Sequence, residues 1–270
     1  MSADPFAELK ARQREMWASF APTATFTTAT AGRLVRFAGI APGERVLDVA
    51  TGTGVVALAA AHRGARVTAL DLTPALLAVA RENASIAGRD DIAWSEGDVE
   101  ALPYPDASFD VVVSQFGHMF APRPDVAIAQ MRRVLRPGGR IAFATWPPEH
   151  LVGRIFQFVG RHSPPPPQGA APPPQWGNPA TVAERLAARF DPPFFERGVM
   201  IVPALSLAHF RLFMETSVGP MQKLVERMQG DPDALSAIRA EFDALVAPYF
   251  ADNVVRQDYL LTRAVAAGAT

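Results

Sequence analysis

Apolar runs and helical stripes alternate along the middle of the chain. Between residues 44 and 146, short runs typical of buried strands alternate with segments whose apolar residues recur every three or four positions. The pattern predicts strands at 45–50, 66–71, 92–95, 109–114 and 139–146, and helices at 53–63, 73–87 and 123–135. This alternation predicts an α/β fold, a Rossmann-like, doubly wound and mostly parallel sheet with helices on both faces.

Helical patterns flank this alternating region on both sides. Residues 5–40 are predicted to be helical, with a break at Ala21-Pro22, and three further helices are expected within 205–251. Shorter helices are expected at 151–162 and from Asn178 to about Phe190, and two more strands at 194–202 and 258–266. The prolines of 164–174 predict a stiff, extended surface connector, although a proline-binding partner could also recognise them.

Composition and charge narrow the class of protein. The 270 residues are 49% hydrophobic with a formal net charge of −1, so no basic excess points to nucleic acid. No apolar run approaches the roughly 20 residues of a membrane span. The absence of cysteine excludes disulfides, thiolate catalysis and cysteine-ligated zinc. Residues Met1–Pro5 lack the start of a secretion signal, and a cytoplasmic location is expected.

The segment Val46–Gly54 predicts a ligand site made of a strand, a tight glycine turn and a helix start. Such a turn lets a ligand lie against bare backbone at the electropositive end of a helix. Two hypotheses fit. The pattern Gly52-x-Gly54-x-x-Ala57, with Asp71 following, matches a dinucleotide site, whereas a frame that begins at the acid Asp48 matches an S-adenosylmethionine site.

Three acids favour the second hypothesis. Asp48, Asp71 and Asp98 stand at or near the ends of three predicted strands, and no Lys or Arg stands with them in these three loops. A carboxylate within a few ångströms of a pyrophosphate would repel it by energies of kcal/mol. The array therefore favours a ligand that carries positive charge and no phosphate.

Four segments in register carry a family resemblance, over roughly residues 40–147. They are VLDVATGTG (46–54), VTALDLTPALLAVARENA (67–84), EGDVEALPYPDASFDVVVSQFGHMFAP (96–122) and MRRVLRPGGRIAFATW (131–146). With them the chain resembles the class I S-adenosylmethionine-dependent methyltransferases, and most of all the group that includes ubiquinone and menaquinone biosynthesis C-methyltransferases. Ala50 stands where many members have a glycine, which predicts only a slight change in how closely the backbone approaches the ligand.

The resemblance implies S-adenosylmethionine as the cofactor and a seven-stranded sheet whose last strand is antiparallel. It also implies three parts: an N-terminal helical lid (1–40), a cofactor-binding core (41–204 and 256–270) and a helical cap over the substrate site (205–255).

Cofactor residues follow from the same resemblance. Asp48 is expected to bind the ammonium of the methionine end, and Asp71 the two ribose hydroxyls. Leu72 would lie against the adenine, with Asp98 on its amino group and the amide of Val99 nearby. The remaining cofactor contacts would be backbone at Ala50, Gly52 and Gly54, and the side chains of Ser114 and Gln115.

The loop after the fourth strand, and one lid residue, are expected to face the methyl acceptor. His118 is the candidate general base for a phenol, enol or amine, although it could instead only shape its loop. Phe116, Met119 and Phe120, with Phe20 from the lid, are expected to line an apolar substrate pocket, or else to pack.

The predicted function is methyl transfer to a small or medium, apolar acceptor. O-, N- and C-methylation stay open, as does the oligomeric state. Metal-site, P-loop and G-x-S-x-G patterns are missing, and the remaining histidines are widely separated, so no metal is expected. The alternatives are an NAD-dependent oxidoreductase and a non-catalytic protein that binds the cofactor.

Overall fold

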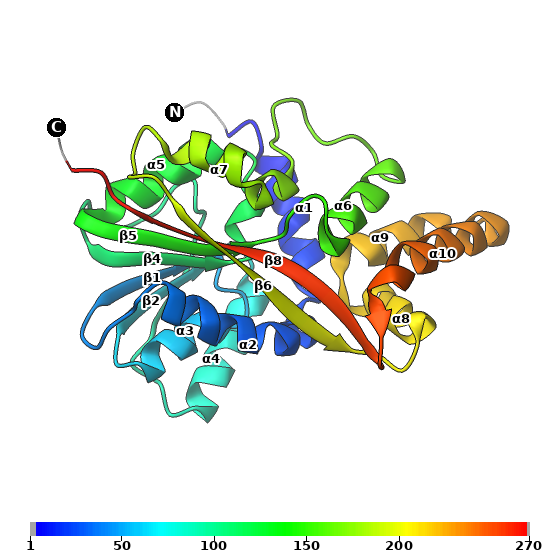
Figure 1. Cartoon of the computed structure of the whole chain (residues 1–270), viewed down its shortest axis with the longest axis horizontal. Helices are drawn as coiled ribbons and strands as arrows, with labels where there is room; N and C mark the ends of the chain where they lie inside the picture. Colours follow the sequence, from blue (N-terminus) through cyan, green and yellow to red (C-terminus); the bar gives the residue numbers. More distant parts are fainter. Residues whose placement is uncertain (1–3, 269–270) are drawn as a thin grey trace.

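One mixed sheet runs through the molecule (Figure 1). The computed structural model describes residues 4–268, so residues 1–3 of the predicted lid and 269–270 of the predicted core lie outside the described residues. The strand order is β3-β2-β1-β4-β5-β8-β6, and β7 pairs with the start of β8. The strands are β1 (Arg45–Val49), β2 (Arg66–Asp71), β3 (Ala93–Glu96), β4 (Phe109–Gln115), β5 (Leu135–Thr145), β6 (Phe194–Pro203), β7 (Phe250–Ala251) and β8 (Val254–Val265).

Strand direction follows the expected pattern. Strands β1 to β5 pair in parallel, and β8 is antiparallel to both of its long neighbours, β5 and β6. The predicted sheet of seven mostly parallel strands with an antiparallel last strand is therefore confirmed, with the two-residue β7 in addition. Strand β5 starts four residues before its predicted start, because Leu135 already pairs with Phe109 and a bulge follows around Gly138 (φ +71°).

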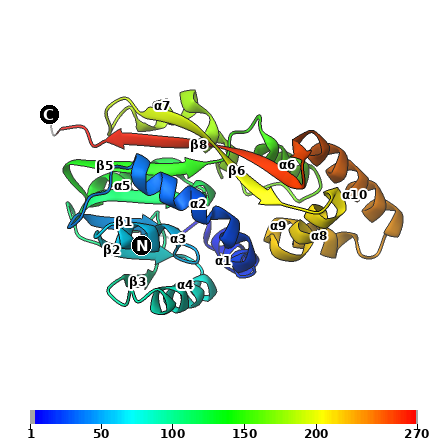
Figure 2. The same ribbon diagram turned by 60° about the horizontal axis from the view of Figure 1, so that its bottom comes forward.

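Helices cover both faces of the sheet (Figures 1 and 2). Helices α2, α3 and α4 lie on one face, and α5 and α7 on the other, as right-handed crossovers require. The helices are α1 (Ala7–Trp17), α2 (Ala21–Phe37), α3 (Val55–His62), α4 (Pro74–Ile86), α5 (Pro124–Val134), α6 (Leu151–Arg161), α7 (Pro179–Leu186), α8 (Leu207–Ser217), α9 (Gly219–Met228) and α10 (Pro232–Val246), with 3₁₀ turns at His118–Phe120, Pro173–Gly177 and Ala247–Tyr249.

Threonines near two helix starts bond within their own segments. The threonine-rich run 23–30 is part of helix α2, where the Thr27 hydroxyl donates to the Ala24 carbonyl (2.7 Å). Thr73 stands at the start of α4, but its hydroxyl caps nothing; its backbone N–H donates to Asp71 Oδ1 instead (2.8 Å).

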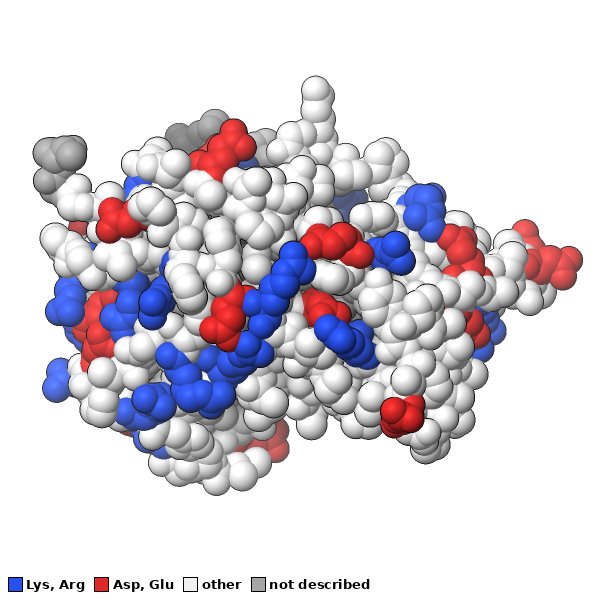
Figure 3. Space-filling view, viewed as in Figure 1, with Lys and Arg blue, Asp and Glu red and all other residues white. Residues whose placement is uncertain are grey.

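Helices α6, α8, α9 and α10 pack together at one end of the molecule, beside the far ends of β6 and β8 (Figure 1). The space-filling view in Figure 3 shows acidic and basic side chains interspersed over the face that carries α2 and the β6–β8 pair. Within residues 4–268, no helix combines the length and apolar character needed to cross a bilayer.

Candidate active site

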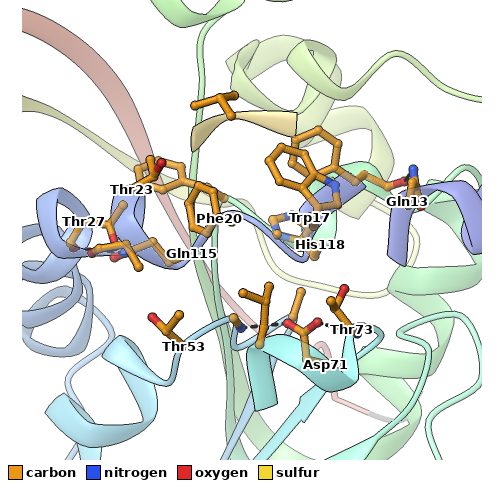
Figure 4. Close-up of a pocket in the computed structure, with 18 of the residues that line it drawn as sticks. Gln13, Trp17, Phe20, Thr23, Thr27, Thr53, Asp71, Thr73, Gln115 and His118 are labelled. Carbon is orange, nitrogen blue, oxygen red and sulfur yellow. Dashed lines mark hydrogen bonds between the residues drawn. The ribbon is translucent and has the colours of Figure 1, made fainter. Parts of the chain in front are cut away.

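A cavity of about 230 Å³ lies at the carboxyl ends of β1, β2 and β4, where ligands bind in such folds. Figure 4 shows Trp17 and Phe20 on one side of it, Thr53, Asp71 and Thr73 on the other, and Gln115 beside Thr27. Twelve predicted site residues line this cavity: Phe20, Asp48, Ala50, Gly52, Asp71, Leu72, Asp98, Val99, Gln115, Phe116, His118 and Phe120.

Three predicted site residues lie behind the cavity wall. Gly54 begins helix α3, where a Cβ would meet the Trp94 ring at 2.8 Å. Ser114 is buried and its hydroxyl accepts the backbone N–H of His118 (3.1 Å), and Met119 is buried in the core. These residues support the site from behind, and the cavity does not reach them.

The glycine turn contains one residue with an unfavourable backbone conformation. Ala50 has φ +53°, which costs a non-glycine residue about 1 kcal/mol. A Cβ added to Gly117 would lie 2.5 Å from the Ala50 Cβ, so the missing side chain at Gly117 leaves room for the Ala50 methyl group. The alanine therefore fits here by a local compensation that the sequence did not suggest.

Asp71 ties the glycine turn to the end of β2. Its Oδ2 accepts the backbone N–H of Gly52 (2.7 Å) and its Oδ1 accepts that of Thr73 (2.8 Å). Burial raises the pKa of the carboxyl, and the amide hydrogen bonds act against that shift. Each oxygen keeps a further lone pair with which to accept a ligand hydroxyl.

Two buried oxygens in the cavity wall have no donor within residues 4–268. They are Asp48 Oδ1 and Gln115 Oε1. The other Asp48 oxygen accepts the Thr51 hydroxyl (2.5 Å), and the Gln115 amide donates to the Thr27 carbonyl (3.1 Å). Complete burial raises the pKa of Asp48 to about 7. Two unpaired acceptors suit a ligand that brings N–H donors and a positive charge.

Asp98 belongs to an ion cluster that helix α1 completes. Lys10 Nζ lies 2.6 Å from Asp98 Oδ2, 2.6 Å from Asp4 and 2.7 Å from Glu100. Burial alone would lower the pKa of the ammonium, but the hydrogen bonds that it donates to the three carboxylates outweigh this effect and raise the pKa. These three acids are close enough to hold a metal ion, but Lys10 already lies among them and Arg123 pairs with Asp4 and Glu100.

His118 is enclosed by aromatic rings. It is 1% exposed, its ring lies 4.5 Å from that of Phe143 and 4.6 Å from that of Trp176, and neither ring nitrogen has a partner within the described chain. Burial, helped by the charge of Arg185, lowers its pKa to about 3, so the imidazole is neutral at pH 7 and a weak base. Its role as general base stays a prediction.

Aromatic and aliphatic side chains form the rest of the cavity. Trp17 packs on Phe120 (4.7 Å between ring centroids), and Phe116 stacks on Trp146 (3.8 Å). The sequence analysis missed the contributions of Trp146, Gln257 and helix α6, which supplies Val152, Ile155, Phe156 and Val159. The apolar stripe of 151–162 was the available signal for α6, but a stripe does not tell which helices face a ligand.

Comparisons with known proteins point to one activity. A family model described as "Methyltransferase domain" matches residues 47–143. Rv1403c, an uncharacterised protein of Mycobacterium tuberculosis, is 34% identical over 92% of each chain. Demethylmenaquinone methyltransferase of Deinococcus radiodurans is 42% identical over 44% of this chain and 51% of its own length.

A solved structure agrees with these matches. Phosphoethanolamine N-methyltransferase 2 of Haemonchus contortus, in complex with phosphomonomethylethanolamine and S-adenosylhomocysteine, aligns with a TM-score of 0.56 at 19% identity. The alignment covers 88% of this chain and 52% of that one. At this identity the likeness concerns the fold alone.

Proposed function

Since the chain belongs to the class I S-adenosylmethionine-dependent methyltransferases of the quinone-biosynthesis type, we propose that its methyl acceptor is an uncharged, mainly apolar molecule of small or medium size. Its cofactor is S-adenosylmethionine, and the match to a methyltransferase domain argues against the NAD-dependent alternative. The acceptor and the attacking atom are the subjects of this proposal.

The cavity wall suits the cofactor at one end. The unpaired oxygens of Asp48 and Gln115 would take the ammonium of the methionine part, and Asp71 the ribose hydroxyls. Leu72 and Val99 would flank the adenine, with Asp98 on its amino group. When bound, S-adenosylmethionine supplies an electrophilic methyl group on a sulfonium.

The distribution of charge carries the proposal for the acceptor. The charged side chains that line the cavity within the described residues are Lys10, Asp48, Asp71 and Asp98, all at the cofactor end. The other end is lined mainly by rings and aliphatic groups: Trp17, Phe20, Phe26, Phe116, Phe120, Trp146, Val152, Ile155, Phe156, Val159, Met200, Val202, Phe213, Met214, Val218, Pro220 and Met221. A charged acceptor would lose its hydration there without finding a partner.

The protein contributes to the reaction by aligning the acceptor with the methyl group and by excluding water from the site. In-line displacement needs the attacking atom held behind the methyl carbon and water kept out. We propose that α1 and α2 form the lid and that α8 to α10 form the cap. Trp17 and Phe20 line the cavity on the lid side, Phe213 and Met214 line it from α8, and α10 packs on α8 and α9. The lid and the cap meet where Phe26 contacts Phe213, and together they would exclude water from the acceptor.

Ligand binding and turnover test the proposal together. We expect S-adenosylhomocysteine, but not NAD, to raise the melting temperature of the protein. We also expect the protein to transfer a radiolabelled methyl group to members of a panel of neutral phenols, quinols and hydrophobic amines. Transfer only to charged acceptors would contradict the proposal. Binding of S-adenosylhomocysteine without transfer to any member of a broad panel would favour a non-catalytic protein.

Lys10 should couple the lid to the adenine end of the site. Replacing it by Met leaves three acids together, one of which is 1% exposed, with only Arg123 near them. We expect Lys10→Met to lower the melting temperature and to raise the dissociation constant of S-adenosylhomocysteine about tenfold, since breaking a buried charge pair costs about 2–5 kcal/mol, shared between folding and binding. Calorimetry measures the binding effect.

Arg12→Met is the matched control on the same helix. Arg12 pairs with Glu8 one turn away, and both side chains are more than half exposed, so its loss should change neither quantity. Equal affinities in Lys10→Met and the wild-type protein would contradict a role of the lid in cofactor binding.

A further inference from the structure

Strands β6 and β8 continue past the end of the main sheet as a ribbon, and the two residues of β7 pair with its tip. Strand β5 ends at Thr145, opposite Leu260, whereas β8 begins six residues further out, at Val254, where it pairs with Pro203 of β6. This ribbon, 199–203 with 254–258, reaches toward the helices α8 to α10 (Figure 1). It forms a wall of the cavity well beyond the cofactor end.

The two faces of the ribbon differ in character. On the inner face, Met200 stands opposite Gln257, Val202 lies further along β6, and all three line the cavity. On the outer face, Val199 and Ile201 are exposed, and charged side chains follow the same path across the surface in Figure 3. Gln257 is thus a polar residue on an inner face that is otherwise apolar.

The Gln257 side chain has no hydrogen-bond partner within residues 4–268, whereas other uncharged polar side chains of the cavity donate to backbone carbonyls. Gln13 donates to the Phe120 carbonyl, Gln115 to the Thr27 carbonyl, and Thr27 to the Ala24 carbonyl. The Gln257 side chain lines the cavity, the residue is 6% exposed, and its carboxamide makes no hydrogen bond within residues 4–268. The amide groups are therefore free to bond a molecule held in the cavity, which Leu or Met at this place could not do.

We propose that Gln257 determines acceptor specificity by hydrogen-bonding an uncharged hydroxyl or carbonyl oxygen on an otherwise hydrocarbon acceptor. The carboxamide can donate to a carbonyl and can either donate to or accept from a hydroxyl, so it recognises both. The carboxamide carries no charge that could balance an anionic or cationic acceptor, and the neighbouring Met200 and Val202 side chains carry no charge either. This inference rests on the proposed function, because it concerns the acceptor end of the same cavity.

Paired probes test the inference. In protein saturated with S-adenosylhomocysteine, calorimetry would compare 1-naphthol with naphthalene, which differ by one hydroxyl group. We expect the wild-type protein to bind 1-naphthol at least about tenfold more tightly, and Gln257→Leu to reduce this ratio below about threefold. Ile201→Gln, which places an amide on the outer face of the same ribbon, should keep the wild-type ratio.

Each other outcome has a distinct meaning. Equal binding of the two probes by the wild-type protein, or an unchanged ratio in Gln257→Leu, would overturn the role of Gln257. Failure of both probes to bind would overturn the apolar acceptor chamber itself, and the inference with it.

The cofactor end of the site provides a control. The thermal shift caused by S-adenosylhomocysteine should be the same in Gln257→Leu and in the wild-type protein, because Gln257 lies at the acceptor end of the cavity.

Discussion

Asp71→Ala should abolish most of the binding of S-adenosylhomocysteine, raising its dissociation constant by about a hundredfold or more. Two effects add. The carboxylate would no longer accept the ribose hydroxyls, and hydrogen bonds to a charged group are worth about 1.5–3 kcal/mol each. The variant also releases the N–H groups of Gly52 and Thr73, which fix the turn against which the ligand lies. Isothermal calorimetry at 15 °C, where the variant should stay folded, measures the change.

Two further variants separate binding from folding. Asp71→Asn keeps one oxygen acceptor and the size of the side chain, so its affinity should lie between those of the wild-type protein and Asp71→Ala. Asp91→Ala removes an exposed carboxylate just before β3 that pairs only with Arg89, and it should bind as the wild-type protein does. An unchanged dissociation constant in a folded Asp71→Ala protein would refute the ribose assignment.

The cofactor half of the site could be predicted from sequence because its signals are local. A strand, an acid and two glycines within Val46–Gly54 fix both the turn and the acid that faces it. The same holds for Asp71, which directly follows an apolar run, and for Asp98, which comes shortly after the strand that begins near Ile92. Strand pairing then brings the three ends together, since β1, β2 and β3 are neighbours in one parallel sheet.

The contributions of the lid and the acceptor half could not be predicted in this way, because long-range packing decides them. Lys10 reaches Asp98 across 88 positions of sequence, and nothing near Lys10 marks it as part of a site. Gln257 fell outside the predicted strand 258–266; a strand that began at Val254 would have shown one polar residue among inward positions. His118 looked like a base by its residue type, whereas its burial against Phe143 and Trp176 sets its chemistry.

Asp48→Asn should stabilise the free protein and weaken cofactor binding. The wild-type carboxyl has a folded pKa of about 7, well above its value of 3.8 in the unfolded chain. Between these values the folded state binds the additional proton, so the stability from this group is complete below about pH 4 and falls as pH rises to about 7. The amide cannot ionise and avoids that loss, which predicts a gain on the order of 1–4 kcal/mol at pH 8.

Melting temperatures of the two proteins from pH 5 to 8 test this directly. The difference should grow with pH and level off above about pH 7. Parallel profiles would mean that Asp48 does not titrate with a raised pKa. Ser108→Ala, at an exposed hydroxyl far from the turn, controls for a general effect of substitution.

Cofactor binding should favour Asp over Asn at position 48, whereas folding stability favours Asn. This gain in binding explains why a destabilising acid is kept in the core. The ligand ammonium favours the ionised carboxylate, so wild-type affinity should rise up to tenfold per pH unit below pH 7 and then decline above about pH 8, where an α-amino group loses its proton. In Asp48→Asn, the amide can place its N–H donors where the unpaired Oδ1 of the wild-type protein lies. The variant should therefore bind S-adenosylhomocysteine at least tenfold more weakly at pH 7.5. Its affinity should change little with pH below pH 7.5. Wild-type affinity that stays constant from pH 5.5 to 7.5 would separate Asp48 from the ammonium and leave its burial without a functional reason.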